Sequence, residues 1–377
     1  MSLPAPPHLH RLERLRAWLD DERLDCAVLF GTDHVTHLCG YARYFGGPSA
    51  LVVGRDGERT LVVMLDEARV ARDLSDADGV VGYGERGFGL DLNPLAKLVS
   101  AVAAVPAVAT ARRVGFASEL AGVEPLLDAE VAAKRVPADE TMHRLRLVKD
   151  PDELARIHAS YDLCWLGQQA VADGSRAGAQ EIELFTAAQS AAQVASGAPI
   201  EFVCDLLTGA NTAEVCCPIH VAGPRRVATG DPVIADIVVR SNGYWGDSAE
   251  THAAGANEEA GAARAELLKI LRTAGAMLAP GATGADLHRE VDARIRAGFP
   301  DGEFPHHAGH ALGLTSFEDP HLIPGDATPF EPWMVLAVEP GVYFPSRFGA
   351  RVENVFVVTP AGGVELREAI GGADGGD

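Results

Sequence analysis

Two aspartates interrupt neighbouring apolar runs in the middle of the chain. Asp236 lies inside the strand-like run 233–239, and Asp247 lies in the return run that begins at Tyr244. The intervening residues 240–243 contain a hairpin signal. A four-residue loop there predicts that the two aspartates lie directly opposite each other, on one face of the hairpin. Two buried like charges repel unless a cation lies between them, so this pair indicates a metal site.

A second pair of carboxylates follows the same logic further along the chain. Glu339 ends the apolar run 334–339, and Glu353 lies near the start of the run 351–358. The two glutamates are equally far from Ser346, inside a loop rich in Pro, Arg and Gly. A hairpin centred on that loop predicts that Glu339 and Glu353 face each other.

Three histidines lie between the two carboxylate pairs, at His306, His307 and His310. Four carboxylates and one imidazole suit two adjacent divalent ions of the Mn or Co kind, with Zn also possible. Two such ions about 3.5–4 Å apart can bridge a water, lower its pKa and deliver hydroxide to a carbonyl. A single acidic residue in a strand usually faces solvent or an ion-pair partner, but every member of this set interrupts an apolar strand or a Gly-rich turn.

Composition excludes several other functions. The chain has 377 residues, 47% of them hydrophobic, and its 32 basic against 53 acidic residues give a net charge of −21. Nucleic-acid binding needs clustered basic residues, so we expect no nucleic-acid partner. No apolar run approaches the roughly 18 residues of a membrane helix, and no membrane association is expected. Six cysteines without a CxxC pattern predict a reduced, cytoplasmic protein.

The chain divides into two regions with different patterns. Helix and strand signals alternate in the first third, with the helical pattern at 12–24 and strand-like runs at 26–30, 50–53 and 60–63. This alternation predicts an α/β domain over residues 1–138 and a second domain over residues 139–377. In the second, Asp150 is expected to cap a long helix that Pro151 opens.

The order of these motifs resembles the pita-bread metallohydrolases, which include methionine aminopeptidases, Xaa-Pro aminopeptidases and dipeptidases, and creatinase. The matching elements are Asp236 followed eleven residues later by Asp247, Gly309-His310-Ala311-Leu312-Gly313, Val338-Glu339-Pro340, and Arg351-Val352-Glu353-Asn354. Residues 24–63 and 144–154 also resemble the amino-terminal domain and interdomain helix start of prolidase and creatinase relatives. The resemblance therefore covers nearly the whole chain.

The resemblance implies an α/β amino-terminal domain followed by an α+β pita-bread catalytic domain with a curved, largely antiparallel sheet. It implies a dinuclear-metal hydrolase that cleaves the amino-terminal or dipeptide bond of small peptides, with Xaa-Pro as the expected type, by attack of metal-activated water. Relatives with this amino-terminal domain commonly form homodimers. The implied metal ligands are Asp236, Asp247, His310, Glu339 and Glu353.

Further roles follow from the same resemblance. Glu339 would be both a ligand and the proton shuttle. His306 and His220 match histidines with catalytic and substrate-side roles, although a hydrogen-bonded structural histidine is an equal reading of His306 and the spacing at His220 is one residue short. Arg351 is expected on the substrate side, where it would orient the carboxylates.

Three departures from the family pattern concern the pocket. Phe317 stands where the family has a histidine thought to bind the scissile carbonyl oxygen, Val238 replaces a usual glycine, and residues 248–251 replace a Thr-Arg-Thr stretch. Phe317 leaves a second function open, the hydrolysis of a non-peptide C–N bond as in creatinase-like or ectoine-hydrolase-like relatives. A third possibility is a non-catalytic binding protein on the same fold, although such relatives typically lose ligands.

Overall fold

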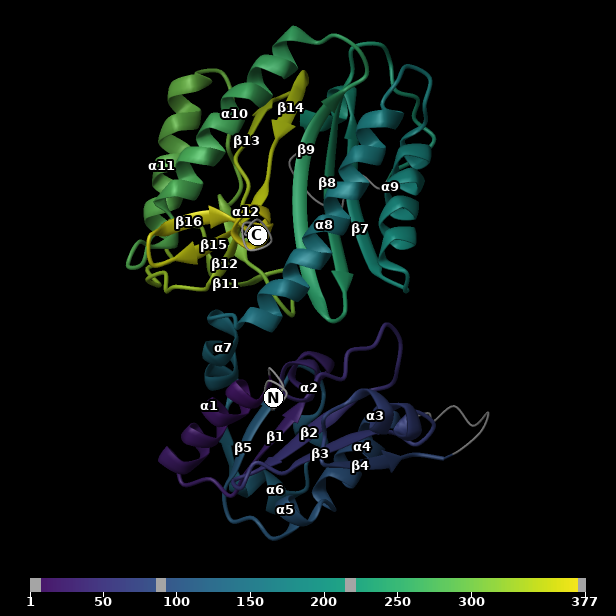
Figure 1. The fold of residues 1–377 in the computed structure, drawn as a ribbon, viewed down its shortest axis with the longest axis vertical. Helices are drawn as coiled ribbons and strands as arrows, with labels where there is room; N and C mark the ends of the chain where they lie inside the picture. Colours follow the sequence, from purple (N-terminus) through teal and green to yellow (C-terminus); the bar gives the residue numbers. More distant parts are fainter. Residues whose placement is uncertain (1–7, 86–92, 214–221, 372–377) are drawn as a thin grey trace, which may run out of the picture. The chain divides into compact units, whose positions relative to one another are not determined.

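The computed structural model of the chain describes residues 8–85, 93–213 and 222–371. Contacts between residues divide the chain into two compact units, Met1–Arg146 and Leu147–Asp377, which are described separately (Figure 1). The division falls within helix α7 (Asp139–Leu147). The domain boundary placed after residue 138 from the sequence stays a prediction.

The first unit is a six-stranded mixed sheet in the order β4-β3-β2-β1-β5-β6. Its strands are β1 (Cys26–Phe30), β2 (Ala50–Gly54), β3 (Arg59–Met64), β4 (Gly79–Tyr83), β5 (Val114–Ser118) and β6 (Arg135–Pro137). The hairpin expected between 50–53 and 60–63 is confirmed, because β2 and β3 pair antiparallel. Strand β1 pairs parallel with β5, which is typical of a domain in which helices connect the strands.

Helices cover both faces of this sheet. The helices are α1 (His8–Asp21), α2 (Thr32–Cys39), α3 (Ala68–Leu74), α4 (Pro94–Ala103), α5 (Pro106–Ala109) and α6 (Ala129–Lys134), with a 3-10 turn at Glu124–Leu126. In β1, Ala27 and Leu29 pack into the core that includes α1 and α2, whereas Val28 and Phe30 pack into the core that includes α4. Because successive strand residues point to opposite faces, this apolar strand is buried on both sides.

The second unit is built from antiparallel strands and long helices. Its helices are α8 (Pro151–Gly174), α9 (Glu181–Ser196), α10 (Glu258–Met277), α11 (Gly284–Gly298) and α12 (Leu366–Gly371). Its strands are β7 (Glu201–Thr208), β8 (Pro232–Ser241), β9 (Tyr244–Ala253), β10 (Gly309–Ala311), β11 (Glu318–His321), β12 (Val335–Val338), β13 (Gly341–Phe344), β14 (Phe348–Arg351), β15 (Asn354–Thr359) and β16 (Gly362–Glu365). They form sheets in the orders β7-β8-β9, β11-β10-β12-β15-β16 and β13-β14.

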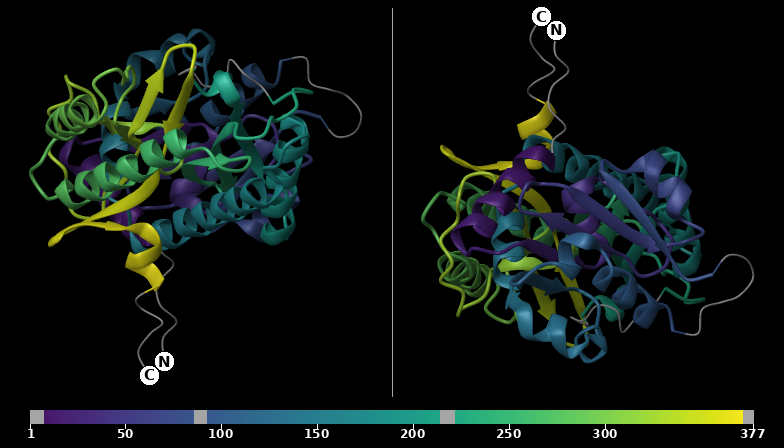
Figure 2. Two further views of the ribbon diagram at one scale, coloured as in Figure 1. Left: turned by 90° about the horizontal axis from the view of Figure 1, so that it is seen from above. Right: turned by 90° about the horizontal axis from the view of Figure 1, so that it is seen from below.

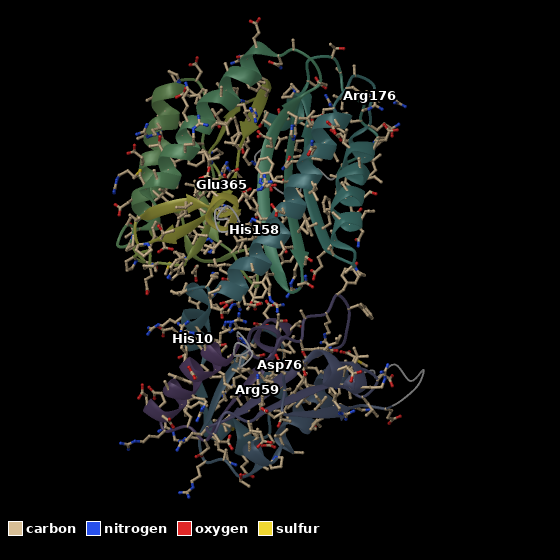
Figure 3. The ribbon with its side chains drawn as sticks, in the orientation of Figure 1. His10, Arg59, Asp76, His158, Arg176 and Glu365 are labelled. Carbon is tan, nitrogen blue, oxygen red and sulfur yellow. The ribbon has the colours of Figure 1, made fainter. Side chains whose placement is uncertain are left out.

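The long helix α8 begins as the sequence predicts. Asp150 accepts hydrogen bonds from the backbone N–H groups of Asp152 and Glu153, and the Glu153 side chain completes a capping box. Figure 1 shows α8 and α9 lying along the sheet β7-β8-β9. The Tyr161 hydroxyl of α8 donates to a carboxylate oxygen of Glu365 at 3.1 Å; Glu365, labelled in Figure 3, is the last residue of β16 and directly precedes α12.

Alternation in β8 determines which side chains face the helices. Val233, Ala235, Ile237 and Val239 pack into the core formed with α8 and α9. Asp236, between them, therefore points to the opposite face of the sheet. The view from above in Figure 2 shows the C-terminal strands in yellow beside the green helix α10, whose buried residues share a second core with β12 and β14.

The β8–β9 hairpin has a tighter turn than the sequence analysis predicts. Ser241 pairs with Tyr244, so the loop is the two residues Asn242 and Gly243 rather than four. Their φ angles are 51° and 85°. Positive φ at both loop residues is the type I′ geometry that Asn-Gly favours, because its twist matches that of the flanking strands. The predicted four-residue loop is wrong.

This register moves the aspartates from directly opposite to diagonal positions. Asp236 lies opposite Ala249, and Asp247 lies opposite Val238. A shift of two residues preserves the face of each side chain, so both carboxylates still project from the same side of the sheet. The predicted direct pairing is wrong, but the predicted common face is confirmed.

The second predicted hairpin register is confirmed. Val338 pairs with Asn354 in β12–β15, and Gly341 pairs with Arg351 in β13–β14, both consistent with a hairpin centred on Ser346. The two pairs of strands are separated by a short break, and Glu339 and Glu353 lie at matching positions within it. Together with the cores described above, the two units confirm the expected α/β domain followed by an α+β domain of largely antiparallel strands. Among residues 8–85, 93–213 and 222–371, no helix has the length and apolar character required to cross a membrane.

The β8–β9 turn generates a stability prediction. Gly243→Ala places a Cβ at φ 85° and should lower the free energy of unfolding by about 1 kcal/mol. Gly261→Ala is the matched control, because a Cβ there meets open space within α10 and should raise stability by about 0.5–1 kcal/mol. Denaturant titration of both full-length variants measures the two effects. Equal shifts of the same sign would contradict the turn geometry.

Candidate active site

Two acidic side chains and one imidazole lie close together in the second unit. They are Asp247 from β9, His310 from β10 and Glu353 from the break before β15. One ligand atom of each lies within 4.8 Å of the others, and all three side chains are buried. The antiparallel strands bring together residues that are far apart in the sequence.

The other two predicted ligands join this cluster. The Glu339 Oε1 atom is 3.7 Å from His310 Nε2, and the Asp247 Oδ2 atom is 3.8 Å from the same nitrogen. Asp236 is close enough to Asp247 and Glu339 for its charge to raise the pKa of both carboxyls. The structure thus gathers all five residues, while their role as metal ligands stays a prediction.

Burial and mutual repulsion disfavour the ionised form of the carboxyl groups in this cluster. Burial, followed by the charge of Asp236, raises the pKa of Glu339 to about 8. Burial and the neighbouring carboxylates raise the pKa values of Asp247 and Glu353 well above the usual range. Within the described residues, Asp247 Oδ1 and Glu353 Oε1 are buried without a hydrogen-bond partner. Divalent cations would neutralise the charges and satisfy these oxygens, so the donor set fits metal binding.

The orientation of His310 also suits a ligand. Its Nδ1 lies 3.0 Å from the carbonyl oxygen of Ala311, which can only accept, so Nδ1 carries the proton. The Nε2 lone pair then faces Asp247 and Glu339. Burial lowers the pKa of His310 to about 3, so the imidazole is neutral. A metal-binding histidine commonly has its other N–H anchored in this way.

A series of buried hydrogen bonds orients Asp236. Arg351 donates from Nη1 to Asp236 Oδ2 and from Nε to the Tyr343 hydroxyl, 2.9 Å away. Because Arg351 can only donate, the Tyr343 hydroxyl gives its own proton to His306 Nε2, 3.1 Å away. His306 Nδ1 in turn donates to the carbonyl of His307 at 2.7 Å.

These hydrogen bonds bear on the substrate-side roles predicted for His306 and Arg351. Both ring nitrogens of His306 are engaged by chain atoms, which favours the structural reading of that histidine. Arg351 is buried and donates to Asp236 and to Tyr343. The substrate-binding roles of His306 and Arg351 stay predictions. His220, the third predicted residue, lies outside the described residues.

Sequence reasoning missed two residues at this site. Asp205 is buried in β7 directly opposite Asp236, so it projects from the same face of the sheet. His307 Nδ1 lies 3.3 Å from Glu339 Oε1 and 3.1 Å from the Gly309 carbonyl oxygen. The signal for Asp205 was a carboxylate inside the apolar run of β7, but its position depends on the β7–β8 register.

Phe317 occupies the edge of the cluster. Its ring centroid is 4.2 Å from that of His310 and 6.0 Å from that of His307. The following residue, Glu318, forms a buried ion pair with Lys149 at 3.0 Å and accepts from the Leu314 backbone N–H at 3.1 Å. These contacts hold the loop that carries Phe317 in place.

Comparison with known proteins agrees with this architecture. The profile described as metallopeptidase family M24 matches residues 155–360, and the creatinase/prolidase N-terminal domain matches residues 11–148. The chain belongs to metallopeptidase family M24. It is therefore a hydrolase of a family that uses divalent metal ions, and the pita-bread fold expected from the sequence is confirmed.

Individual M24 relatives cover most of the chain. A putative dipeptidase, YkvY, from Bacillus subtilis is 26% identical over 96% of this chain and 98% of its own length. A probable dipeptidase, PepE, from Mycobacterium tuberculosis is 30% identical over 71% of this chain and 70% of its own length. The solved structure of the prolidase from Pyrococcus horikoshii superposes with a TM-score of 0.80 and 20% identity, covering 95% of this chain and 97% of that one, which shows a shared fold.

The carboxylate cluster predicts metal-dependent stability in this M24 protein. Wild-type protein should bind close to two equivalents of Mn²⁺ or Co²⁺, with a rise in melting temperature, because the ions relieve buried repulsion. Glu353→Gln should weaken binding by at least about tenfold. Asp173→Asn, an exposed carboxylate near the end of α8, is the control and should leave binding unchanged. Calorimetry and elemental analysis measure these outcomes; unchanged binding by Glu353→Gln would exclude Glu353 as a ligand.

The hydrogen bonds that link Asp236, Arg351 and Tyr343 predict that removal of the Tyr343 hydroxyl lowers the stability of the protein. Tyr343→Phe should lower the free energy of unfolding by about 1–3 kcal/mol, because it leaves buried partners on Arg351 and His306 unsatisfied. Tyr44→Phe, at an exposed position, should have no effect. Urea denaturation of both variants distinguishes them, and equal stability of Tyr343→Phe and wild type would contradict the assigned hydrogen bonds.

Proposed function

We propose that this M24 metallopeptidase is a dipeptidase that hydrolyses small peptides, Xaa-Pro dipeptides in particular, at a dinuclear metal centre. The observation that carries the proposal is the convergence of four buried carboxylates and one neutral imidazole on a single face. Two relatives are named as a putative and a probable dipeptidase, which supports the same substrate class.

In this proposal the five clustered residues hold two divalent ions, with Mn or Co preferred and Zn possible. The holding residues are Asp236, Asp247, His310, Glu339 and Glu353. When bound, ions of this kind would lower the pKa of a coordinated water and polarise the scissile carbonyl. The Arg351 hydrogen bond keeps Asp236 oriented, and the Ala311 carbonyl keeps His310 in the tautomer that offers Nε2.

Glu339 is the proposed proton shuttle. The water oxygen bonds to the carbonyl carbon, the C–N bond breaks, and the proton released by the water reaches the leaving nitrogen through the Glu339 carboxylate. Its position at the centre of the cluster, 3.7 Å from His310 Nε2, supports this role. His307 Nδ1, 3.3 Å from Glu339 Oε1, limits the orientations available to that carboxylate.

The substrate-side roles of His306, His220 and Arg351 belong to the same proposal. His306 contacts substrate only if the peptide displaces the Tyr343 hydroxyl from its Nε2. Arg351 acts through Asp236, which it orients by a direct hydrogen bond.

Compartment and assembly complete the proposal. A reduced, cytoplasmic location is supported by Cys26, Cys39 and Cys164, which are buried thiols without a disulfide in the described part of the chain. A homodimer is the expected assembly, and light scattering of the purified full-length chain measures it directly.

A second candidate function follows from Phe317, which has no N–H to offer a substrate carbonyl at the edge of the cluster. It is the hydrolysis of a non-peptide C–N bond. A screen that includes Xaa-Pro peptides together with cyclic and amidino compounds separates the two candidates. Chelator-sensitive hydrolysis of the non-peptide compounds alone would favour the second.

Replacing the proposed shuttle tests the mechanism. Glu339→Gln should lower kcat for Xaa-Pro hydrolysis by at least about 10²-fold while the protein stays folded, because an amide cannot accept the proton. Glu331→Gln, at an exposed position, should match wild type. Chromatographic assay of released proline and circular dichroism measure the two properties, and retained turnover in Glu339→Gln would remove Glu339 from the mechanism.

A further inference from the structure

A hollow of about 640 Å³ lies on the face of the β7–β8–β9 sheet that is turned away from the acidic cluster. Its floor is strand β9, and its walls belong to helices α8, α10 and α12. His252, which lines it, lies opposite Val233, a residue that packs into the core formed with α8 and α9. The volume is within the range of about 300–1,000 Å³ that is typical of small-molecule sites. We call this space the β9 hollow.

Residues that depart from the family pattern lie on this face of β9. In the stretch 248–251, Ser248 and Glu250 alternate with the inward-facing residues and project away from Asp247. Glu250 lines the hollow and is buried. A buried polar side chain on a helix-covered face is costly unless it has partners, and the proposed hydrolysis gives these residues no role. The β9 hollow is therefore a candidate for a separate function.

The charged side chains of the hollow form two ion pairs. Arg264 donates from Nε and Nη2 to the two carboxylate oxygens of Glu250, at 2.7 and 2.6 Å. Arg367 Nε lies 3.0 Å from Asp162 Oδ1. Each guanidinium has five N–H donors, so both can donate to a further acceptor. Because the four charges cancel, the hollow offers donors without net charge, which suits a zwitterion better than an anion.

Apolar surface lies beside these ion pairs. The Trp165 ring lines the hollow, with the guanidinium carbon of Arg367 at 5.6 Å from its centroid. Leu166 lines it as well and is 42% exposed. An adjoining hollow of about 330 Å³ shares three lining residues with it, Ala172, His252 and Arg264. The space therefore has room and apolar surface for a side chain.

Gln168 connects this face of the sheet to the strands that carry the aspartates. Its Nε2 donates to the carbonyl oxygens of Ala235 and Ser248, at 2.9 and 3.0 Å. These two residues are the chain neighbours of Asp236 and Asp247. Gln168 is 1% exposed, so water does not compete for its hydrogen bonds. A ligand that restricts Gln168 acts on the backbone beside both aspartates.

His252 forms the contact between Gln168 and the hollow. Carbonyl oxygens only accept, so the NH₂ group of Gln168 faces them, and its Oε1 accepts from His252 Nε2 at 3.0 Å. The neutral imidazole therefore has its proton on Nε2 and a lone pair on Nδ1. In the part of the chain that the structure describes, Nδ1 has no hydrogen-bond partner. A ligand N–H group in the hollow can donate to it.

We propose that the β9 hollow is a second, non-catalytic ligand site that binds a small zwitterion with an apolar side chain, the chemical class of a free amino acid such as leucine. The ligand carboxylate accepts from Arg264 or Arg367, and the ligand ammonium group donates to His252 Nδ1. The apolar side chain packs against Trp165 and Leu166.

Occupancy of the site strengthens metal binding at the acidic cluster. A ligand bound to His252 restricts Gln168, which in turn restricts the backbone beside Asp236 and Asp247. Two sites coupled in this way affect each other's affinity by the same factor. The site contains none of the predicted metal ligands, so it does not depend on the proposed dipeptidase function.

Calorimetry with L-leucine tests the site on the full-length protein, both loaded with Mn²⁺ and after chelation. Wild type should bind leucine in both states. Ala172→Phe places a large side chain in the hollow from the exposed surface of α8 and should weaken this binding at least about tenfold. Ala265→Phe, at an exposed position on α10 away from the lining residues, is the matched control and should bind leucine like wild type.

A second variant tests recognition of the carboxylate. Arg367→Gln should weaken leucine binding by about fivefold, because a charge-assisted hydrogen bond is lost. Arg296→Gln removes an exposed arginine that pairs with Asp292 on α11 and should have no effect. Leucine binding that chelation abolishes and that Ala172→Phe leaves unchanged would overturn the site, as would the absence of saturable binding up to about 20 mM leucine.

The coupling is measured as the Kd for Mn²⁺ with and without saturating leucine. Leucine should lower this Kd by about fivefold in wild type and leave it unchanged in Ala172→Phe. An equal effect of leucine in the two proteins would overturn the coupling. None of these measurements requires turnover, so a failure to hydrolyse peptides would contradict the dipeptidase proposal alone.

Discussion

The repulsion among buried carboxylates is the constraint on which the second unit depends. Asp247, Glu339 and Glu353 are each buried, and burial together with the charge of Asp236 raises the pKa of each. A protein interior tolerates such groups in the ionised form only when positive charge is supplied, and otherwise they take up protons. One source is the Arg351 guanidinium, which binds Asp236 directly. A single guanidinium cannot balance four acids, so the remaining charge accounts for the affinity expected for divalent ions.

The strand alternation that buries the apolar residues also gathers these acids. In β8 the residues that pack on α8 and α9 are separated by Asp236, which is turned to the opposite face. The same geometry places Asp205 beside Asp236 and Val238 beside Asp247. One face of this sheet packs against α8 and α9, and the other carries the acidic side chains. The packing on the first face therefore fixes the positions of the acids on the second.

Much of this site was readable from residue types and spacing, because carboxylates inside apolar runs are costly and therefore informative. The register around Glu339 and Glu353 followed from symmetry about Ser346 alone. The register at Asp236 did not, because the turn preference of Asn242-Gly243 outweighed a count of loop residues. Asp205 and the Tyr343 hydroxyl on His306 depend on contacts between distant segments, which spacing along one chain cannot show. The contact between the rings of Phe317 and His310 likewise joins two positions on the loop and strand that spacing alone does not bring together.

The two-residue turn between β8 and β9 limits how this hairpin can vary in evolution. Asp236 and Asp247 share a face because the number of residues between them matches the two-residue repeat of the strands. Losing one residue from either strand would rotate one carboxylate toward α8. Insertions and deletions between these two positions are therefore compatible with an intact centre in steps of two, or with a bulge that absorbs the extra residue.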